Sequence, residues 1–185
     1  AVANVASVIA RELFLRDIQK MSEEVFDSST STFDFDLSLK PELWSAEKPD
    51  LYTLVVNKGG DYFGQAVGFR DVKIENAVLK VNGRRIRIKG TDRHEMSPET
   101  GYTVTRADME RDIWLMKSLN LNAVRTSHYP NDPMWYDLCD RLGIYVLCEA
   151  NIESHGMGYG DKSLAHRADY KAAHIERAVR MIQTH

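Results

Sequence analysis

The feature of this sequence that most constrains its fold is a change in hydrophobic period near residue 86. Between residues 33 and 88, apolar and polar residues alternate, as they do in half-buried β-strands. Beyond that point, short apolar runs alternate with longer amphipathic segments, which is typical of β-strand–α-helix units. We therefore expect two structurally different parts within one chain.

The first part carries short strand signals separated by turn residues. Period-two signals occur at residues 33–39, at residues 52–56, at Val67 with Phe69, and at residues 78–88. The last signal contains Asn82-Gly83, a pair that tolerates the positive φ of a type I′ hairpin turn. We predict an immunoglobulin-like β-sandwich over residues 1–83, truncated at its N-terminus, because about 80 residues is short against the roughly 100 of a typical sandwich. Residues 10–30 receive no assignment.

The second part contains apolar strand signals at residues 86–90, 122–126 and 144–149. Helix signals lie between and after them. Thr105 and Asp108 have the spacing of a capping box, whereas Asp132 with Pro133 begins a second helix that Gly143 ends. The first and last helices each carry one apolar face, formed by Met109, Ile113 and Met116 and by Ile175, Val179 and Ile182.

Three consecutive strand–helix units predict a parallel sheet. Two architectures fit this pattern, an open doubly wound sheet and a closed (β/α)8 barrel. No glycine-rich phosphate loop follows any of the strands, which argues against the dinucleotide-binding form of the open sheet. Hydrophobic periodicity alone does not choose between the two architectures.

Composition and charge exclude two classes of function. The net charge is −3 and no dense Lys/Arg run occurs, which argues against a nucleic-acid partner. No apolar run approaches the roughly 20 residues that a membrane-spanning helix needs. Cys139 and Cys148 lie in apolar stretches and are expected to be reduced thiols. The compartment stays open between cytoplasm and periplasm, with the cytoplasm slightly favoured.

Titratable side chains cluster where the predicted parallel strands end. His94 and Glu95 follow the first strand, Arg125 and His128 the second, and Glu149, Glu153 and His155 the third, with Asn131, Asp132 and Asn151 at the same level. In a parallel barrel this carboxyl-end edge holds the active site. The sequence therefore indicates a polar site assembled from several loops.

Each of these residues also has a plain structural interpretation. His94 can be a surface histidine, and His128-Tyr129-Pro130 can be a rigid turn before a helix. Arg125 can simply pair with Glu149, because a buried arginine usually needs a carboxylate. Glu153 and His155, two residues apart, point the same way in an extended segment and suit metal chelation. Short patterns of this kind are unspecific, however. His166, His174 and His185 are expected to be solvated.

Several longer motifs resemble family 2 glycoside hydrolases. The segment NAVRTSHYPNDPMWYDLCDRLGIYVL, residues 122–147, resembles the signature segment of that family. Upstream, LWSAEKPDLYTLVV, VGFRDVKIEN and VNGRRIRIKGTDRHE resemble the same enzymes in the same order, and EANIESHGMGYG resembles the β-galactosidase branch. The resemblance implies a sandwich domain followed by the N-terminal part of a (β/α)8 catalytic barrel over residues 84–185.

The resemblance also implies roles for individual residues. His94 and His128 correspond to histidines that bind galactosyl hydroxyls, bonds that assist catalysis when they strengthen in the transition state. Arg125 corresponds to an arginine beside the nucleophile, and Glu149 is expected to support the active site with it. Glu153 and His155 correspond to ligands of a Mg²⁺ ion, and Na⁺ is a second candidate cation of the complete enzyme.

Two positions depart from the family pattern, and two catalytic groups are missing. Asp92 stands where the family more often has Asn, and Cys148 where it commonly has Asp. Retaining glycosidases also need an acid/base and a nucleophilic carboxyl group about 5 to 5.5 Å apart. In this family both come from later strands, in segments that do not occur here. We therefore expect an internal fragment that is inactive alone, an expectation that fits its start in an apolar stretch without Met.

The leading hypothesis is thus a fragment of a retaining β-galactosidase that hydrolyses terminal β-D-galactosyl residues, from a homo-oligomeric parent with no nucleic-acid or membrane partner. A β-glucuronidase or β-mannosidase of the same family is the alternative enzyme. A non-catalytic module that binds sugar or serves a structural role is the alternative from another class. The Glu153–His155 pair favours the galactosidase, because the resemblance gives that branch the metal site.

Overall fold

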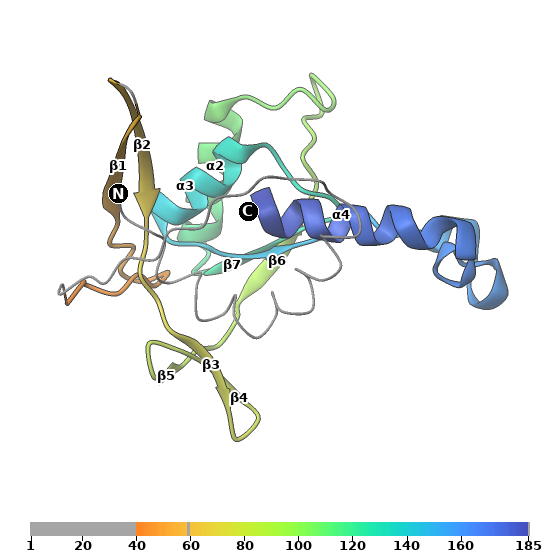
Figure 1. Ribbon diagram of the computed structural model, residues 1–185, viewed down its shortest axis with the longest axis horizontal. Coiled ribbons are helices and arrows are strands. Elements are labelled where there is room, and N and C mark those ends of the chain that lie inside the picture. The colour runs from red at the N-terminus through yellow and green to blue at the C-terminus, as the bar shows by residue number, and fades with distance from the viewer. Residues whose placement is uncertain (1–39, 59, 185) are drawn as a thin grey trace.

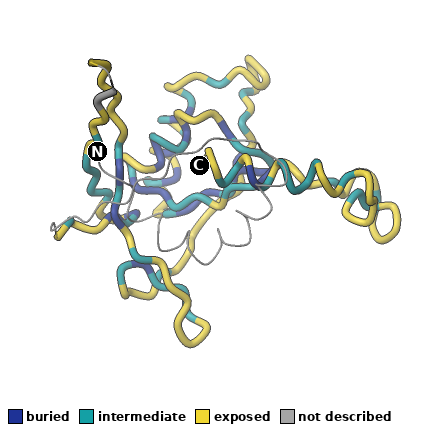
Figure 2. Tube along the Cα trace, in the orientation of Figure 1, coloured by how far each residue is buried: buried dark blue, intermediate teal, exposed yellow. Residues whose placement is uncertain are grey.

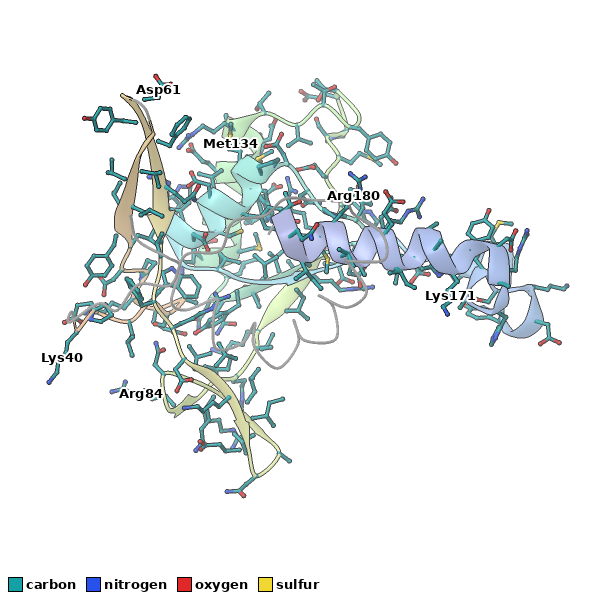
Figure 3. The ribbon with its side chains drawn as sticks, viewed as in Figure 1. Lys40, Asp61, Arg84, Met134, Lys171 and Arg180 are labelled. Carbon is teal, nitrogen blue, oxygen red and sulfur yellow. The ribbon has the colours of Figure 1, made fainter. Side chains whose placement is uncertain are left out.

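The computed structural model describes residues 40–58 and 60–184 of the chain. The strand predicted at residues 33–39 and the unassigned residues 10–30 lie outside the described residues. At the centre of Figure 1, two helices lie beside a small parallel sheet, and antiparallel strands and one long helix extend away from it. Figure 3 shows Asp61, Arg84 and Lys171 on three separate projections of the molecule.

The antiparallel strands form two separate sheets. Strands β1 (Tyr52–Lys58) and β2 (Asp61–Val67) pair along their whole length. The second sheet has the order β3 (Val72–Glu75), β4 (Val78–Val81) and β5 (Arg84–Arg85). The predicted hairpin is confirmed, because Asn82 and Gly83 have φ values of 53° and 74°, the left-handed values that a type I′ turn requires. The immunoglobulin-like sandwich over residues 1–83 stays a prediction.

Two predicted strand positions were wrong. Val67 ends β2 rather than beginning a strand, and Phe69 makes only an isolated bridge to Leu43. The strand expected at residues 86–90 begins at Gly90 instead. The amide of Lys89, just before that strand, donates to the side chain of Asn122 at 2.9 Å, so it does not take part in a strand ladder.

The central sheet is parallel throughout, as predicted. It consists of β6 (Gly90–Arg93), β7 (Ala123–Thr126) and β8 (Tyr145–Cys148), in that order. Strands that neighbour each other in sequence are also neighbours in space. This order is compatible with the opening arc of a (β/α)8 barrel.

Two helices cover one face of this sheet. Helices α2 (Arg106–Ser118) and α3 (Pro133–Leu142) contact each other and pack with β7. Both predicted starts are confirmed, with a full capping box at Thr105 and an Asp132 cap before Pro133. The core between helices and sheet is made of Met109, Ile113, Met116, Val124, Trp135, Leu138, Cys139 and Ile144. Figure 2 shows this buried centre and the exposed projections around it.

Beyond β8 the chain leaves the body of the molecule and returns. Four short 3-10 turns follow, at His155–Met157, Gly160–Lys162, Leu164–His166 and Ala168–Tyr170. The long helix α4 (Lys171–Thr184) then runs back toward the sheet, as Figure 1 shows, and buries Val179 from its predicted apolar face. Across the described residues, none of the helices is both long and apolar enough to cross a membrane.

The segment before the antiparallel sheets is anchored to the other end of the parallel sheet. Trp44 is buried and donates from Nε1 to the carbonyl of Asp140 at 2.8 Å. The ammonium group of Lys117 donates to the carbonyls of Ala46 and Gly143 at 3.0 and 2.7 Å. Gly143 ends α3 with φ 75°, in the left-handed region, just before β8. These contacts lie at the amino end of β8.

Loss of the Thr105 cap is expected to destabilise the fold modestly. The Thr105 hydroxyl accepts from the Asp108 amide, and the Asp108 carboxylate accepts from the Thr105 amide. Thr105→Ala leaves the Asp108 amide without this acceptor and is expected to lower the free energy of unfolding by about 1 kcal/mol. Urea denaturation followed by circular dichroism measures the change. Thr105→Ser keeps the hydroxyl and serves as the control, so equal losses in both variants would argue against the cap.

Candidate active-site edge at the carboxyl end of the sheet

The carboxyl end of the parallel sheet brings most of the predicted site residues together. The last residues of β6, β7 and β8 are in register across the sheet. The loops that follow therefore start at one edge, and they carry His94, His128 and Glu149. Arg125, one residue before the end of β7, contacts both His128 and Glu149. Four predicted residues from three strands thus form one cluster.

Glu149 bridges the other two charged or polar groups of this cluster. Its Oε1 accepts from Arg125 Nε at 2.6 Å, and its Oε2 lies 2.7 Å from His128 Nδ1. Partial burial acts to raise the pKa of Glu149, but hydrogen bonds from Arg125 and His128 outweigh it and lower the pKa below its usual value. Glu149 is therefore a carboxylate at neutral pH. The pairing of Arg125 with Glu149, weighed as the plain alternative, is present in the structure.

The two predicted sugar-binding histidines lie next to each other. The His94 and His128 rings meet edge to face, with centroids 5.4 Å apart and planes 80° apart. His94 is exposed and His128 is half-buried. Tyr129 borders the same place, with its ring centroid 6.3 Å from that of His94. Two imidazoles from different strands can therefore contact one small polar ligand.

The Arg125 side chain lies on the sheet face opposite the covering helices. Its register partner on β6 is Asp92, whose Oδ2 lies 3.4 Å from Arg125 Nη1. On its other side, Arg125 pairs in register with Leu147 of β8, which is 45% exposed. More than half of the Leu147 surface is covered, but the remainder faces solvent in the part of the chain that the structure describes. The face that would be interior in a barrel is therefore open here.

Glu153 and His155 contact each other further along the same chain. The side chains hydrogen-bond through Glu153 Oε1 and His155 Nδ1, and hydrogen bonds from His155 lower the pKa of Glu153. A protonated His128 would act in the same direction, so Glu153 is within electrostatic reach of the cluster. Among residues 40–58 and 60–184, no group of three or more His, Cys, Asp or Glu side chains could hold a metal ion. The pair offers two donors toward a Mg²⁺ shell, which is a partial fit.

Sequence reasoning missed Arg93, which organises the structure beneath this edge. Its side chain is 6% exposed and lies over the Trp135 ring, with Cζ 3.8 Å from the ring centroid. It donates to Asp112 Oδ2 at 3.0 Å and to Asn131 Oδ1 at 2.8 Å. Glu95 Oε1 lies 3.5 Å away. Because no apolar neighbour marks Gly90–Arg93 as a buried strand, the sequence gives no signal that this arginine is internal.

Three residues predicted to line the edge instead hold its loops together. Glu95 accepts from the Asp132 amide at 2.9 Å, and its own amide donates to the Tyr129 hydroxyl at 3.2 Å. Asn131 is buried and bonded to Arg93. Asn151, the remaining polar candidate, is exposed, and its carbonyl accepts from Arg177 on α4 at 2.7 Å. These groups connect the loops to one another and to α4.

Both departures from the family pattern lie inside this network. Asp92 contacts Arg125, as described above. Cys148 is a free thiol whose Sγ lies 3.1 Å from the Tyr136 hydroxyl, and that hydroxyl accepts from the Asn131 amide. Neither substituted residue displaces His94, His128 or Glu149 from the cluster.

A parallel strand–helix sheet with histidines, an arginine and carboxylates at its carboxyl edge has the arrangement that α/β-barrel proteins use for a polar site. Residues 72–185 match the sequence profile described as "Glycosyl hydrolases family 2, TIM barrel domain". The match covers well over half of the chain. The chain belongs to glycosyl hydrolase family 2.

Curated relatives share substantial sequence identity over most of the chain. A "Beta-galactosidase" of Vibrio vulnificus (strain YJ016) is 52% identical over 124 residues, covering 64% of this chain and 12% of that protein. A "Beta-galactosidase" of Yersinia enterocolitica is 48% identical over 149 residues, covering 77% of this chain and 14% of that protein. The chain thus spans only about an eighth of the length of these relatives.

Solved structures agree with the family assignment. A family 2 β-galacturonidase from Eisenbergiella tayi bound to galacturonate matches with a TM-score of 0.55 and 43% identity, over 57% of this chain and 19% of that one. A β-glucuronidase from Faecalibacterium prausnitzii matches with a TM-score of 0.56 and 38% identity, over 58% of this chain and 18% of that one. The strand–helix sheet is therefore part of a TIM barrel domain.

Proposed function

We propose that this chain carries the sugar-binding part of the active site of a retaining β-galactosidase. The observation that carries the proposal is the meeting of His94 and His128 at the carboxyl edge of the sheet, 5.4 Å apart between ring centroids. Both residues come from segments that match β-galactosidase motifs, and curated β-galactosidases are 48–52% identical to the chain. Imidazoles can hydrogen-bond sugar hydroxyls, and such bonds assist glycoside hydrolysis when they strengthen in the transition state.

The carboxylates of the cluster are not suited to protonate a leaving group. A general acid in a glycosidase needs a raised pKa. The pKa of Glu149 is lowered by its hydrogen bonds from Arg125 and His128, despite an opposing effect of burial, and that of Glu153 is lowered by His155. We therefore propose that the acid/base is supplied by another residue of the complete enzyme. We propose the same for the nucleophile, because Arg125 and His128 occupy the two carboxylate oxygens of Glu149.

We propose Glu153 and His155 as ligands of a Mg²⁺ ion. Mg²⁺ commonly uses one or two carboxylates and keeps several waters, so two protein donors are compatible with it. When bound, the ion would supply positive charge beside the sugar. The pair lies within electrostatic reach of His128. Isothermal titration of the chain with MgCl₂ tests the assignment, and equal heats for the wild type and Glu153→Gln would contradict it.

A panel of nitrophenyl glycosides tests the proposed activity. The complete protein that contains this sequence is expected to release nitrophenol from the β-galactoside, whereas the purified 185-residue chain is expected to release none. Galactose titrated against the chain is expected to bind weakly and saturably through the retained histidines. Hydrolysis by the chain itself would contradict the assignment of the carboxylates, and turnover of glucuronide without galactoside would contradict the substrate.

His128→Ala in the complete protein is expected to lower kcat/KM for the galactoside by about a hundredfold, the effect of losing one hydrogen bond that strengthens in the transition state. Steady-state kinetics measures the loss. His166→Ala is the matched control, because His166 lies in a 3-10 turn beyond the cluster and is exposed. A similar effect in both variants would show that His128 does not contact the sugar.

A β-glucuronidase is the second candidate function. The observation that favours it is the set of structural neighbours, which includes a β-glucuronidase and a β-galacturonidase with TM-scores of 0.55–0.56. Uronic acids carry a carboxylate that needs a cationic partner. Arg125 is a cation in contact with His128, but Glu149 already occupies its Nε group. This occupation favours the neutral sugar, and the glycoside panel separates the two.

A further inference from the structure

The hydrogen-bonding state of His128 can be deduced from its neighbours. Its Nδ1 lies 2.7 Å from Glu149 Oε2 and 3.0 Å from Arg125 Nη2. A neutral imidazole has one nitrogen that donates and one that accepts, and a guanidinium only donates. Nδ1 therefore cannot satisfy both neighbours: it either donates to the carboxylate or accepts from the arginine.

The Glu149 carboxylate is the stronger hydrogen-bond partner of His128 Nδ1. An ionised carboxylate only accepts, and a charge-assisted bond is shorter and stronger than a neutral one. The contact with Glu149 is the shorter of the two. Arg125 already has two acceptors without His128, because its Nε donates to Glu149 Oε1 at 2.6 Å and its Nη1 contacts Asp92 Oδ2 at 3.4 Å. His128 therefore carries its proton on Nδ1.

We propose that Glu149 is a positioning residue that fixes His128 in the Nδ1–H tautomer and directs its Nε2 lone pair to the sugar site. The direction of Nε2 rests on the proposed function, in which His128 contacts the sugar. In a neutral imidazole, a proton on Nδ1 leaves Nε2 as an acceptor. The hydroxyl it contacts must then donate, so its own oxygen remains available to a second donor or a cation. Glu149 thus determines what kind of hydrogen bond the site makes.

A purely structural role for Glu149 predicts a different behaviour of the His128 tautomer. If Glu149 served only to neutralise Arg125, the tautomer of His128 would not depend on it. Both carboxylate oxygens are in use, however, one on each partner. The tautomer therefore separates the two roles, and it is visible without any sugar or any turnover.

Long-range ¹H–¹⁵N correlation spectra of the 185-residue chain, labelled with ¹⁵N-histidine, read the tautomer directly. At a pH where the ring is neutral, His128 of the wild type is expected to show a protonated Nδ1 and an unprotonated Nε2. In Glu149→Gln the carboxylate is gone and the Arg125 guanidinium can donate to Nδ1, so the proton is expected to move to Nε2. Glu149→Asp retains a carboxylate and is expected to restore the Nδ1–H form, at least in part.

Asp92→Asn is the matched control. It removes the other carboxylate on Arg125 without touching His128, and the tautomer is expected to stay unchanged. A wild-type His128 with its proton on Nε2 would overturn the proposal, even if every variant failed to fold. So would an unchanged Nδ1–H form in a folded Glu149→Gln chain. An Nδ1–H tautomer that depends on Glu149, in a protein that turns over no galactoside, would leave the tautomer assignment standing and remove only the proposed function.

Discussion

Replacing Arg93 with methionine is expected to lower the free energy of unfolding by roughly 3–5 kcal/mol, a large share of the stability of a typical domain. The side chain is 6% exposed and pairs with Asp112 and with Glu95, which is itself only 15% exposed. Methionine fills a similar volume over Trp135 but leaves Glu95 and Asn131 without their cationic partner. Most of the expected loss of unfolding free energy comes from these polar groups, which are left without a hydrogen-bonding partner.

Urea denaturation measures this loss, and a matched substitution controls for it. Arg106→Met also removes an arginine paired with a glutamate, but that pair is exposed on the surface of α2. Such a pair contributes less than about 0.5 kcal/mol. Arg93→Lys keeps the charge but loses the planar guanidinium group that stacks on Trp135. We therefore expect an intermediate loss of stability. Equal effects of the methionine change at both arginines would refute the assigned role of Arg93.

Gly143→Ala is expected to destabilise the chain by roughly 2–5 kcal/mol, for two independent reasons. Gly143 has φ 75°, a left-handed conformation that costs any residue with a Cβ about 1–2 kcal/mol. In addition, a Cβ at this position would overlap the carbonyl oxygen of Ala46. Because the obstacle is backbone, it moves only if the anchored segment around Trp44 moves with it.

Gly83→Ala separates these two contributions. Gly83 has φ 74°, almost the same conformation, but a Cβ there would meet no atom within 4 Å. The free energy of unfolding of Gly83→Ala is therefore expected to fall by only about 1–2 kcal/mol. The difference between the two variants measures the steric contact with Ala46. If both variants lose the same stability, the segment around Ala46 does not pack against Gly143 in solution.

Local signals in the sequence identified much of the barrel part. The caps at Thr105 and Asp132, the Gly143 terminator and the apolar face of α2 depend on residues at most a few positions apart, and all are present in the structure. The start of β6 was misplaced because the pairing of Lys89 is decided by Asn122, more than thirty residues away. Interactions across such distances leave no local pattern to read.

The candidate site shows the same difference between local signals, which the sequence reveals, and long-range contacts, which it does not. The position of His94, His128 and Glu149 after successive parallel strands predicted that they meet, and they do. Their roles toward a sugar remain predictions. The inward turn of Glu95 and Asn131 was not foreseeable, because it depends on a buried Arg93 within a polar run, Gly90–Arg93. A charged residue gives the same sequence signal whether it faces water or a tryptophan.

Trp44 and Ala46 anchor the preceding segment at the amino end of the parallel sheet, at the opposite end from the candidate site. The amino rim contributes to stability alone, whereas the carboxyl rim combines the buried Arg93 network with, under the proposed function, the choice of ligand. An engineer seeking a hardier enzyme would redesign around Lys117 and Gly143 and leave the chemistry unaltered. One seeking a new sugar preference would diversify the loops after β6, β7 and β8, and the two sets of changes should combine additively.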